Sequence, residues 1–329
     1  MSQKKNIKKL KLKNHEWVNI KKTGREEVAW FESKSSFHPL HYEDCRGKAQ
    51  HPKIDIADDY AFIALLFPLY NKSTRTIEAA EVDFIITKDT LYTVHDNLLK
   101  PLMDMDTIVN TDKTFSLPPK NKTSAVLLYI IIKKLLDYCL PMLDHMSEDI
   151  SDIEKHLFNG KKEKKMAREL LGVKRNIVNF RRTLGSHKNI LKKFTETKKP
   201  YLRTSIMAPY YIDLIEQTKQ IWDLIETHRE TINALHETNE SIQNDQMNDI
   251  MKTLTMFSII IFSLTLVAAW FSMGADGGRP FINSENSFWI VMFIESIVTN
   301  RSKRAVVPTI SVVDYSQSDN GKVKRQYER

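Results

Sequence analysis

The 329-residue sequence predicts an α/β domain followed by helices, the last of which is long enough to cross a membrane. Two short apolar runs rich in Ile, Phe, Tyr and Val, at 60–70 and 81–96, predict sheet strands. From 123 to 195 the spacing of apolar residues becomes helical. Between Lys252 and Asp276 there are 23 residues without a formal charge, although 27% of the chain is charged.

The region 1–121 is predicted to form the α/β part of a cytoplasmic domain. Its segment "SSFHPLHYEDC" (35–45) predicts a short helix that Ser35 or Ser36 caps. A Lys-Asp pair at 88–89 predicts the turn that divides the second apolar run into two strands. The only two cysteines of the chain precede the uncharged stretch and give no sign of a disulfide framework, which fits a cytoplasmic location.

The region 122–208 is predicted to form a helical hairpin with its hinge at Gly160, and Pro200 and Pro209 bracket a break after it. The stalk and first membrane helix are expected at 209–274. Apolar residues of the stalk recur at steps of seven, three and seven, which is typical of a seam that packs on copies of the helix or on a neighbour. We expect this seam to have no partner within one subunit. Its residues are Ile225, Ile232, Leu235 and Ile242.

The uncharged stretch predicts a membrane helix. A helix rises about 1.5 Å per residue and the hydrocarbon core of a bilayer is about 30 Å thick, so roughly 20 apolar residues cross it. The alternative is a buried helix of a soluble domain, but such helices usually have a polar stripe, and here only scattered hydroxyls are polar. We therefore expect a stalk that joins a cytoplasmic domain to a membrane pore.

The formal net charge is +8, and much of the excess lies in basic runs at 4–13 and 159–175. Basic runs can bind nucleic acid or anionic lipid. Neither run has interleaved aromatic residues, so we expect no nucleic acid partner. We expect a solvated face or a mobile N-terminal tail instead.

Several segments, in this order, resemble those of the CorA-type magnesium transporters. The resemblance covers about residues 15 to 300 and implies a homopentamer with an α/β cytoplasmic funnel. Each subunit would contribute one stalk helix to a central pore, with a second membrane helix outside it and both termini in the cytoplasm. The implied location is the cell membrane, multi-pass, in contact with lipid, and the implied bound ion is Mg2+. The segments are "FHPLHYEDC", "HPKIDIADDYAFIALLFPLY", "TLYTVHDNLL", "VKRNIVNFRRTL" and "NDQMNDIMKTLTMFSIIIFSLTLVAAWFSM".

The chain departs from the family pattern after the first membrane helix. The family has Gly-Met-Asn there, whereas this chain has Ser272, Met273 and Gly274. Five Asn side chains would form a ring of neutral oxygens for hydrated magnesium, but Gly274 supplies only backbone carbonyls. In the external loop, 275–286, five copies of Asp276 would attract divalent ions with less discrimination. We therefore expect weaker magnesium selectivity than is normal for the family.

The second membrane helix, expected at 287–304, is degraded. Its apolar run, 288–298, has 11 residues, roughly half the height that a membrane needs, and it contains Glu295. A helix over 281–300, a re-entrant stub and a damaged reading frame are all open alternatives. The tail at 305–329 is unassigned.

The resemblance implies that one face of the first membrane helix lines the pore. Its amide at the cytoplasmic end and its hydroxyls would form polar rings, and its Met, Leu and Phe side chains would form constrictions that close by expelling water. Alternatively, the same face packs a seam between helices. The residues of this face recur at steps of three or four: Asn248, Met251, Leu254, Ser258, Phe262, Thr265, Ala269 and Ser272.

Asp213, at the lower end of the stalk, falls by an ungapped count where the CorA family has an acidic residue that binds regulatory magnesium between subunits. Carboxylates brought together at interfaces favour a separated, open arrangement unless a divalent ion bridges them. Asn71 is the candidate second ligand. The alternative for Asp213 is a solvated carboxylate on a helix face.

The segment at 35–45 also suggests a metal site, because two His, Glu43, Asp44 and Cys45 are residue types that bind zinc. The same segment matches a structural helix of the CorA family, and we favour the structural role. The soluble part has no Ser-His-Asp or Gly-rich phosphate signature, so an enzyme is not expected.

The sequence thus predicts a homopentameric divalent cation channel that is gated by intracellular Mg2+. Magnesium is the first choice of cargo, with cobalt, nickel or zinc behind it. The alternative is a non-conducting, CorA-like membrane scaffold or sensor whose mouth and second helix have decayed.

If Gly274 is the weak point of the mouth, Gly274→Asn, ideally combined with Ser272→Gly, should increase magnesium uptake into liposomes and its preference over other divalent ions. The reason is that a ring of amide oxygens replaces backbone carbonyls. Unchanged flux and selectivity would mean that position 274 is not at the filter or that no pore conducts.

Overall fold

The computed structural model describes residues 6–12, 15–21, 24–46, 51–111, 123–158 and 163–272, together with Phe293 and Ile297. Several expectations concern residues outside these ranges. They are the hinge at Gly160, the signature residues Met273 and Gly274, the loop at 275–286 with Asp276, the second membrane helix at 287–304 apart from two positions, and the tail at 305–329.

The described part of the chain contains one mixed sheet in the order β1-β2-β6-β5-β4-β3. Neighbouring strands pair antiparallel except β2 and β6, which pair in parallel. The predicted strands at 60–70 and 81–96 are present, and the second run turns at Lys88 and Asp89. The strand bounds are β1 Ile7–Leu12, β2 His15–Ile20, β3 Lys53–Ile56, β4 Tyr60–Asn71, β5 Thr76–Thr87 and β6 Thr90–His95.

The basic N-terminal run is not a mobile tail over its whole length, because Ile7–Leu12 forms β1 at the edge of the sheet. In its sequence, IKKLKL, apolar and charged residues alternate only partly, so the pattern does not predict a strand. Lys8, Lys9 and Lys11 are exposed, and lysines on an edge strand discourage pairing with other chains. The predicted solvated face is therefore present, but on a strand.

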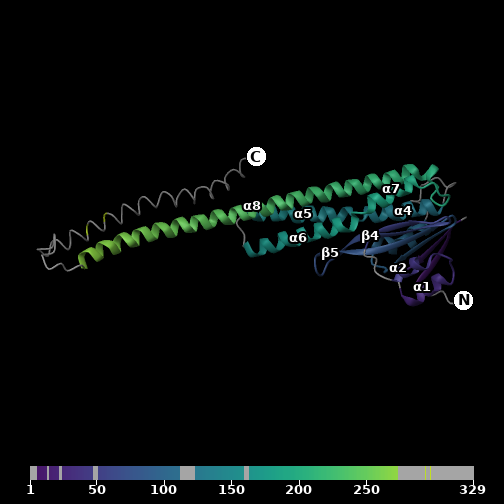
Figure 1. Cartoon of the computed structure of the whole chain (residues 1–329), viewed down its shortest axis with the longest axis horizontal. Coiled ribbons are helices and arrows are strands. Elements are labelled where there is room, and N and C mark those ends of the chain that lie inside the picture. The colour runs from purple at the N-terminus through teal and green to yellow at the C-terminus, as the bar shows by residue number, and fades with distance from the viewer. Residues whose placement is uncertain are drawn as a thin grey trace. The chain divides into compact units, whose positions relative to one another are not determined.

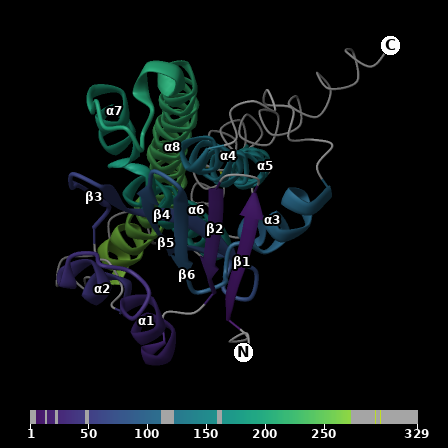
Figure 2. The ribbon, with the colours of Figure 1, turned by 90° about the vertical axis from the view of Figure 1, so that its right-hand side faces the viewer.

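Helices cover both faces of the sheet (Figure 2). On one face, α1 (Arg25–Glu32) and α2 (Pro39–Arg46) place Phe31, Tyr42 and Cys45 on Phe62 and Ile85 of the sheet. On the other face, α4 (Ser124–Asp137) and α6 (Glu163–Leu184) contact β4, β5 and β6. The central strands are therefore buried on both faces and read as continuous apolar runs.

The region predicted to be helical contains α4, α5 (Leu140–Phe158), α6 and α7 (His187–Glu196), and α3 (Lys100–Thr111) precedes it. α4 begins at a side-chain cap, in which the Thr123 hydroxyl accepts a hydrogen bond from the Val126 N–H. α8 follows as a 69-residue helix, Thr204–Ser272 (Figure 1). These helices, after the sheet, confirm the predicted fold class.

The break before the stalk lies earlier than Pro209, which is inside α8. The chain turns at Arg203, whose positive φ of 49° ends the preceding segment. The N–H groups of Ile206 and Met207 then donate to the Arg203 carbonyl and start the helix. Proline at 209 removes only one bond to a carbonyl of the first helical turn. Packing of Tyr211, whose hydroxyl donates to the Leu202 carbonyl at 2.8 Å, holds the turn in place.

Two asparagines of α6 hold the first residues of β5. The Asn176 side chain accepts from the Ile77 N–H at 3.0 Å and donates to the Arg75 carbonyl at 2.9 Å. Asn179 donates to the Ile77 carbonyl at 2.9 Å. Arg75 has a φ of 53°, so this clamp also fixes a turn residue in the left-handed region. The sheet and the helical hairpin are therefore joined by polar contacts as well as apolar packing.

Asn176→Ala should lower the free energy of unfolding by about 1–3 kcal/mol, because it leaves the Ile77 N–H and the Arg75 carbonyl without their partner. Thermal unfolding of the full-length protein in detergent measures the change. Asn189→Ala is the matched control, since Asn189 is exposed on α7. Equal losses in the two variants would show that the clamp contributes nothing.

Candidate functional site

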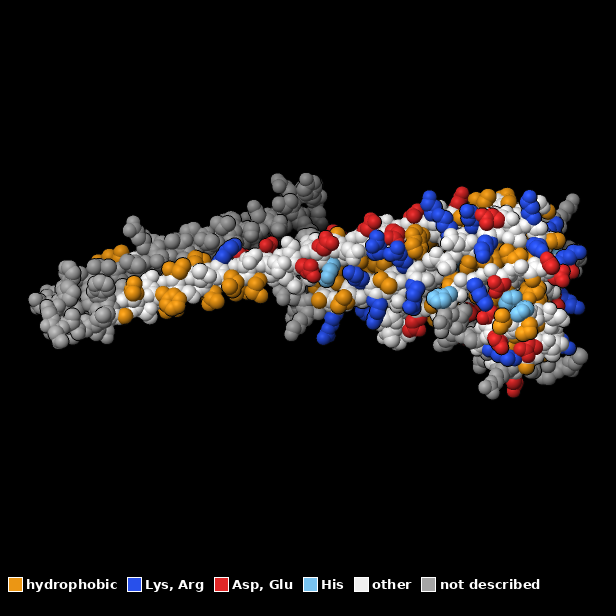
Figure 3. Space-filling model, in the orientation of Figure 1, with side chains coloured by type: hydrophobic (Ala, Val, Ile, Leu, Met, Phe, Trp, Pro, Cys, Tyr) orange, Lys and Arg blue, Asp and Glu red, His pale blue; other side chains and the backbone are white. Residues whose placement is uncertain are grey.

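The second half of α8 carries the candidate membrane span. Among the described residues, α8 is the helix that is long and apolar enough to cross a membrane, with a mean hydropathy of 1.5 over its most apolar window. None of that window is buried inside the chain. Figure 3 shows apolar side chains along this half and mixed charges over the domain that precedes it. The apolar surface therefore needs lipid or another protein surface to cover it.

The predicted pore residues that can be placed lie on this exposed part of α8. Ser258 is half-buried, whereas six of the others are exposed, and 71% of the Phe262 surface is accessible. Ser272 is the last residue of the helix. The exposed residues are Asn248, Met251, Leu254, Phe262, Thr265 and Ala269.

Two hydroxyls of the predicted pore face already use their protons. The Ser258 hydroxyl donates to the Leu254 carbonyl at 2.9 Å, and the Thr265 hydroxyl donates to the Phe262 carbonyl at 3.0 Å. A hydroxyl that donates to its own helix keeps its oxygen lone pairs as acceptors. Both positions can therefore present neutral acceptors to a hydrated cation.

Exposure alone does not single out the predicted face. Ile250 and Phe257 are exposed on the same stretch, at angles around the helix outside the predicted pore face. Exposed apolar side chains of this half of α8 are therefore not confined to the predicted pore face. The choice of a pore face remains a prediction from the family resemblance.

The seam in the lower half of α8 is covered within the chain. Ile225 and Ile232 have at most 1% of their surface exposed and Leu235 has 8%. α8 packs there on α6, where Arg181 reaches Glu226 at 2.9 Å and lies over the Trp222 ring. The expectation that this seam has no partner within one subunit is therefore wrong for these three residues, whereas Ile242, the fourth residue of the seam, is half-buried. Its spacing records packing on a neighbour in the same chain.

Asp213 is held by α4 of its own chain. Its Oδ2 atom accepts from Lys133 Nζ at 2.6 Å and from the Tyr129 hydroxyl at 2.8 Å. Partial burial opposes ionisation of Asp213, but these hydrogen bonds outweigh it and lower the pKa of the carboxyl group. Hydrogen bonding to Asp213 raises the pKa of Lys133 to about 12. Asp213 is thus an ionised carboxylate with a fixed cation beside it.

Asn71 is engaged elsewhere. Its side-chain oxygen accepts from the N–H of Ser73 at 3.1 Å, and its amide donates to Glu78 at 2.9 Å. These bonds close the turn between β4 and β5. The structure gives Asn71 and Asp213 no shared hydrogen-bond partner among the described residues, so one chain does not bring this predicted pair together.

The predicted short helix of the His-rich segment is α2, which packs on the sheet, but it begins at Pro39, so Ser35 and Ser36 do not cap it. The His41 ring stacks on Phe62 at 4.6 Å, and its Nδ1 atom lies 3.1 Å from the Tyr60 hydroxyl. Burial lowers the pKa of His41 despite the nearby Asp55 carboxylate. Within the described ranges, no group of three or more His, Cys, Asp and Glu side chains is placed to hold a metal ion.

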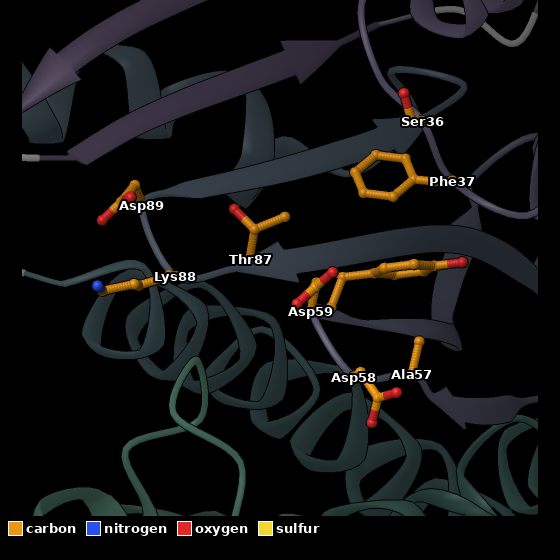
Figure 4. A pocket seen from close by; sticks show the side chains of 9 residues that line it. Ser36, Phe37, Ala57, Asp58, Asp59, Thr87, Lys88 and Asp89 are labelled. Carbon is orange, nitrogen blue, oxygen red and sulfur yellow. The ribbon is translucent and has the colours of Figure 1, made fainter.

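A hollow of about 360 Å³ lies at one end of the sheet (Figure 4). The rings of Phe37 and Tyr60, 4.6 Å apart, form part of its wall. Asp58, Asp59 and Asp89 also line it, and Asp58 pairs with Lys199 at 2.7 Å. No sequence motif indicated this hollow, because its residues come from three separate connections of the fold.

An α/β domain whose last helix continues without a break into an apolar span defines a class of membrane proteins with a large soluble domain before the membrane. The chain belongs to the CorA-like Mg2+ transporter protein family, whose model matches residues 13–299. The resemblance stated from the sequence is thereby confirmed. This is a family of transporters and not of enzymes, as expected.

The chain is similar to known members over most of its length. It is 26% identical over 261 residues to the cobalt/magnesium transport protein CorA of Thermotoga maritima, covering 79% of this chain and 73% of the relative. The complete structure of the CorA magnesium transporter from Methanocaldococcus jannaschii matches with a TM-score of 0.76 at 20% identity, over 89% of this chain and 90% of that one. The full-length CmaX structure matches with a TM-score of 0.67 at 17% identity, over 88% of each chain.

Proposed function

We propose that this protein is a homopentameric divalent metal cation channel of the cell membrane, with its N-terminal domain in the cytoplasm and magnesium as its main cargo. Cobalt, nickel or zinc are the secondary cargoes. The observation that carries the proposal is the single helix α8 of a CorA-family chain. Its first half packs in the soluble domain, and its second half is an exposed apolar span. The names of the relatives, which mention cobalt and magnesium transport, support the choice of cargo.

Assembly follows from the surface of α8. A single helix encloses no pore, so a channel needs several copies of the chain around one axis. The side chains from Met247 to Leu266 that are exposed in one chain supply the apolar surface for such contacts and for lipid. The buried residues Ile225, Ile232 and Leu235 pack within the chain and supply no surface for contacts between subunits.

The pore chemistry suits a hydrated ion. Magnesium releases its water reluctantly and prefers oxygen ligands, so neutral acceptors that grip the hydrated ion conduct it better than a tight cage. Ser258 and Thr265 offer such acceptors, because their protons are bonded to the helix. Phe262 lies between them and would close the path when five rings meet.

A non-conducting scaffold or sensor is the second candidate. The observation that favours it is the replacement of the family's Gly-Met-Asn by Ser272, Met273 and Gly274. Such a protein would keep the assembly and the cytoplasmic domain but pass no ions. Ion flux separates the two candidates.

The channel reading is tested by magnesium uptake into liposomes that contain the purified protein. The wild type should take up magnesium, and Phe262→Ala should leak even at high magnesium, because it removes an apolar plug. Phe257→Ala is the matched control, since Phe257 is also exposed on α8 but off the predicted pore face. Native mass spectrometry of the same preparations should give five copies. A pentamer without flux in any variant would favour the scaffold, and a monomer would remove the pore.

Lys133 competes with magnesium for the Asp213 carboxylate in the proposed regulation. Both groups are more than a third exposed, so their ion pair is worth at most about 1 kcal/mol. A magnesium ion that bridges Asp213 to a neighbouring subunit has to displace this ammonium group or bind beside it. Intracellular magnesium would then close the channel by binding the closed state better than the open one.

Lys133→Met should lower, by about fivefold, the magnesium concentration that protects the stalk from limited proteolysis, because it removes the competing cation. Lys134→Met, at an exposed neighbouring position of α4, is the control and should change little. Asp213→Asn should weaken the protection. If all three variants are protected like the wild type, Asp213 is only a surface charge.

A further inference from the structure

His187 is a histidine in the interior of the cytoplasmic domain. It is the first residue of α7, and none of its surface is exposed. Its ring meets the ring of Phe67 on β4 edge to face, with the ring centroids 5.1 Å apart. Neither of its ring nitrogens makes a hydrogen bond to a described residue. The ring therefore packs as an apolar group between the start of α7 and the sheet.

A positive charge on the His187 ring would have nothing to compensate it. No charged side chain of the described residues acts on the ring, and the Leu184 carbonyl, which favours a proton there, lies outside hydrogen-bonding geometry. The first turn of α7 contains no acidic residue, and the exposed neighbours along the chain, Arg182 and Lys188, are basic. The N-terminal end of a helix also carries a partial positive charge, which repels a cation.

The ring is therefore neutral in the folded domain. Burial outweighs the Leu184 carbonyl and lowers the pKa of His187 from 6.5 to about 3. A histidine that reaches water takes up a proton at a much higher pH than this buried ring does. Acidification therefore favours any arrangement in which the ring is exposed.

The other end of α7 is held independently of His187. The Phe194 ring meets the Tyr211 ring of α8 at 5.2 Å, and the Phe194 carbonyl accepts from the Thr204 hydroxyl at 3.4 Å. The first turn of α7 therefore packs on the sheet through His187, whereas its last turn packs on α8. The two ends can separate from their partners one at a time.

We propose that His187 makes the contact between α7 and β4 acid-sensitive: a proton on its ring releases the first turn of α7, while the end at Phe194 stays on α8. The released ring reaches water, which hydrates its charge. This device lies within the cytoplasmic domain and does not depend on the transport function.

The direction of the pH effect follows from linkage. The native ring binds a proton more weakly than an exposed ring does, so the contact has its full stability above the ordinary pKa of 6.5 and loses stability as pH falls toward about 3. Between about pH 7.5 and about pH 5.5, the equilibrium constant for release should rise roughly tenfold, because the exposed ring becomes largely protonated over this range.

Hydrogen exchange of the α7 amides in the full-length protein measures the release, with His187→Leu as the variant that cannot take up the proton. At each pH, the exchange rate of the wild type is divided by that of the variant, so the intrinsic pH dependence of exchange cancels. This ratio should rise roughly tenfold between about pH 7.5 and about pH 5.5. His145→Leu is the matched control, because 77% of the His145 side chain is exposed, and the ratio of this control to the wild type should stay constant.

His187→Phe, which keeps a ring against Phe67, takes the place of His187→Leu if that variant fails to fold. A ratio that does not change with pH would overturn the proposal. An equal rise for the amides of α4 and α6 would also overturn it, because the proton would then destabilise the whole domain and not the first turn of α7.

Discussion

The burial of the lower half of α8 is the constraint on which the rest of the structure depends. This one helix packs on α4, α6 and α7 through the Tyr129–Tyr210 rings, the Arg181–Trp222 contact and the Phe194–Tyr211 rings. Burial of apolar side chains stabilises the first half of α8 within the domain, whereas the apolar side chains of its second half are exposed. One helix therefore contributes both to the core of the domain and to an apolar span that the chain itself does not cover.

The sheet is tied to this helical layer by few contacts of high directional precision. Asn176 and Asn179 bond the backbone of β5, and Ser124 at the start of α4 donates to the carbonyl of Thr87 at 2.6 Å. Hydrogen bonds fix orientation better than apolar packing does. The start of β5 is therefore fixed on α6, which contacts α8 through Arg181.

Much of the fold could be predicted from the sequence, because β4, β5 and the span are long and chemically uniform. The parallel pairing of β2 and β6 could not, since their register arises between residues more than 70 positions apart. At the candidate site, the count along α8 selected Asp213 as a candidate, but Lys133, which binds it, is 80 positions away on another helix and no local pattern marks it. Likewise the spacing of Ile225 and Ile232 indicated a packed seam without naming its partner. The role of Met273 and Gly274 at the pore mouth stays a prediction, because these residues lie outside the described ranges.

The hydroxyl side chains of the span all donate to carbonyls of their own helix, which affects how α8 can move against a neighbouring helix. Thr253, Thr255, Ser258 and Ser263 each donate to the carbonyl four residues earlier, and Thr265 donates to the carbonyl three residues earlier. A second helix lying against these positions finds no hydroxyl proton that it must capture or release. Sliding or rotation of an adjacent helix against this face then breaks no bond that these hydroxyl protons make, while the hydroxyl oxygens stay available as acceptors.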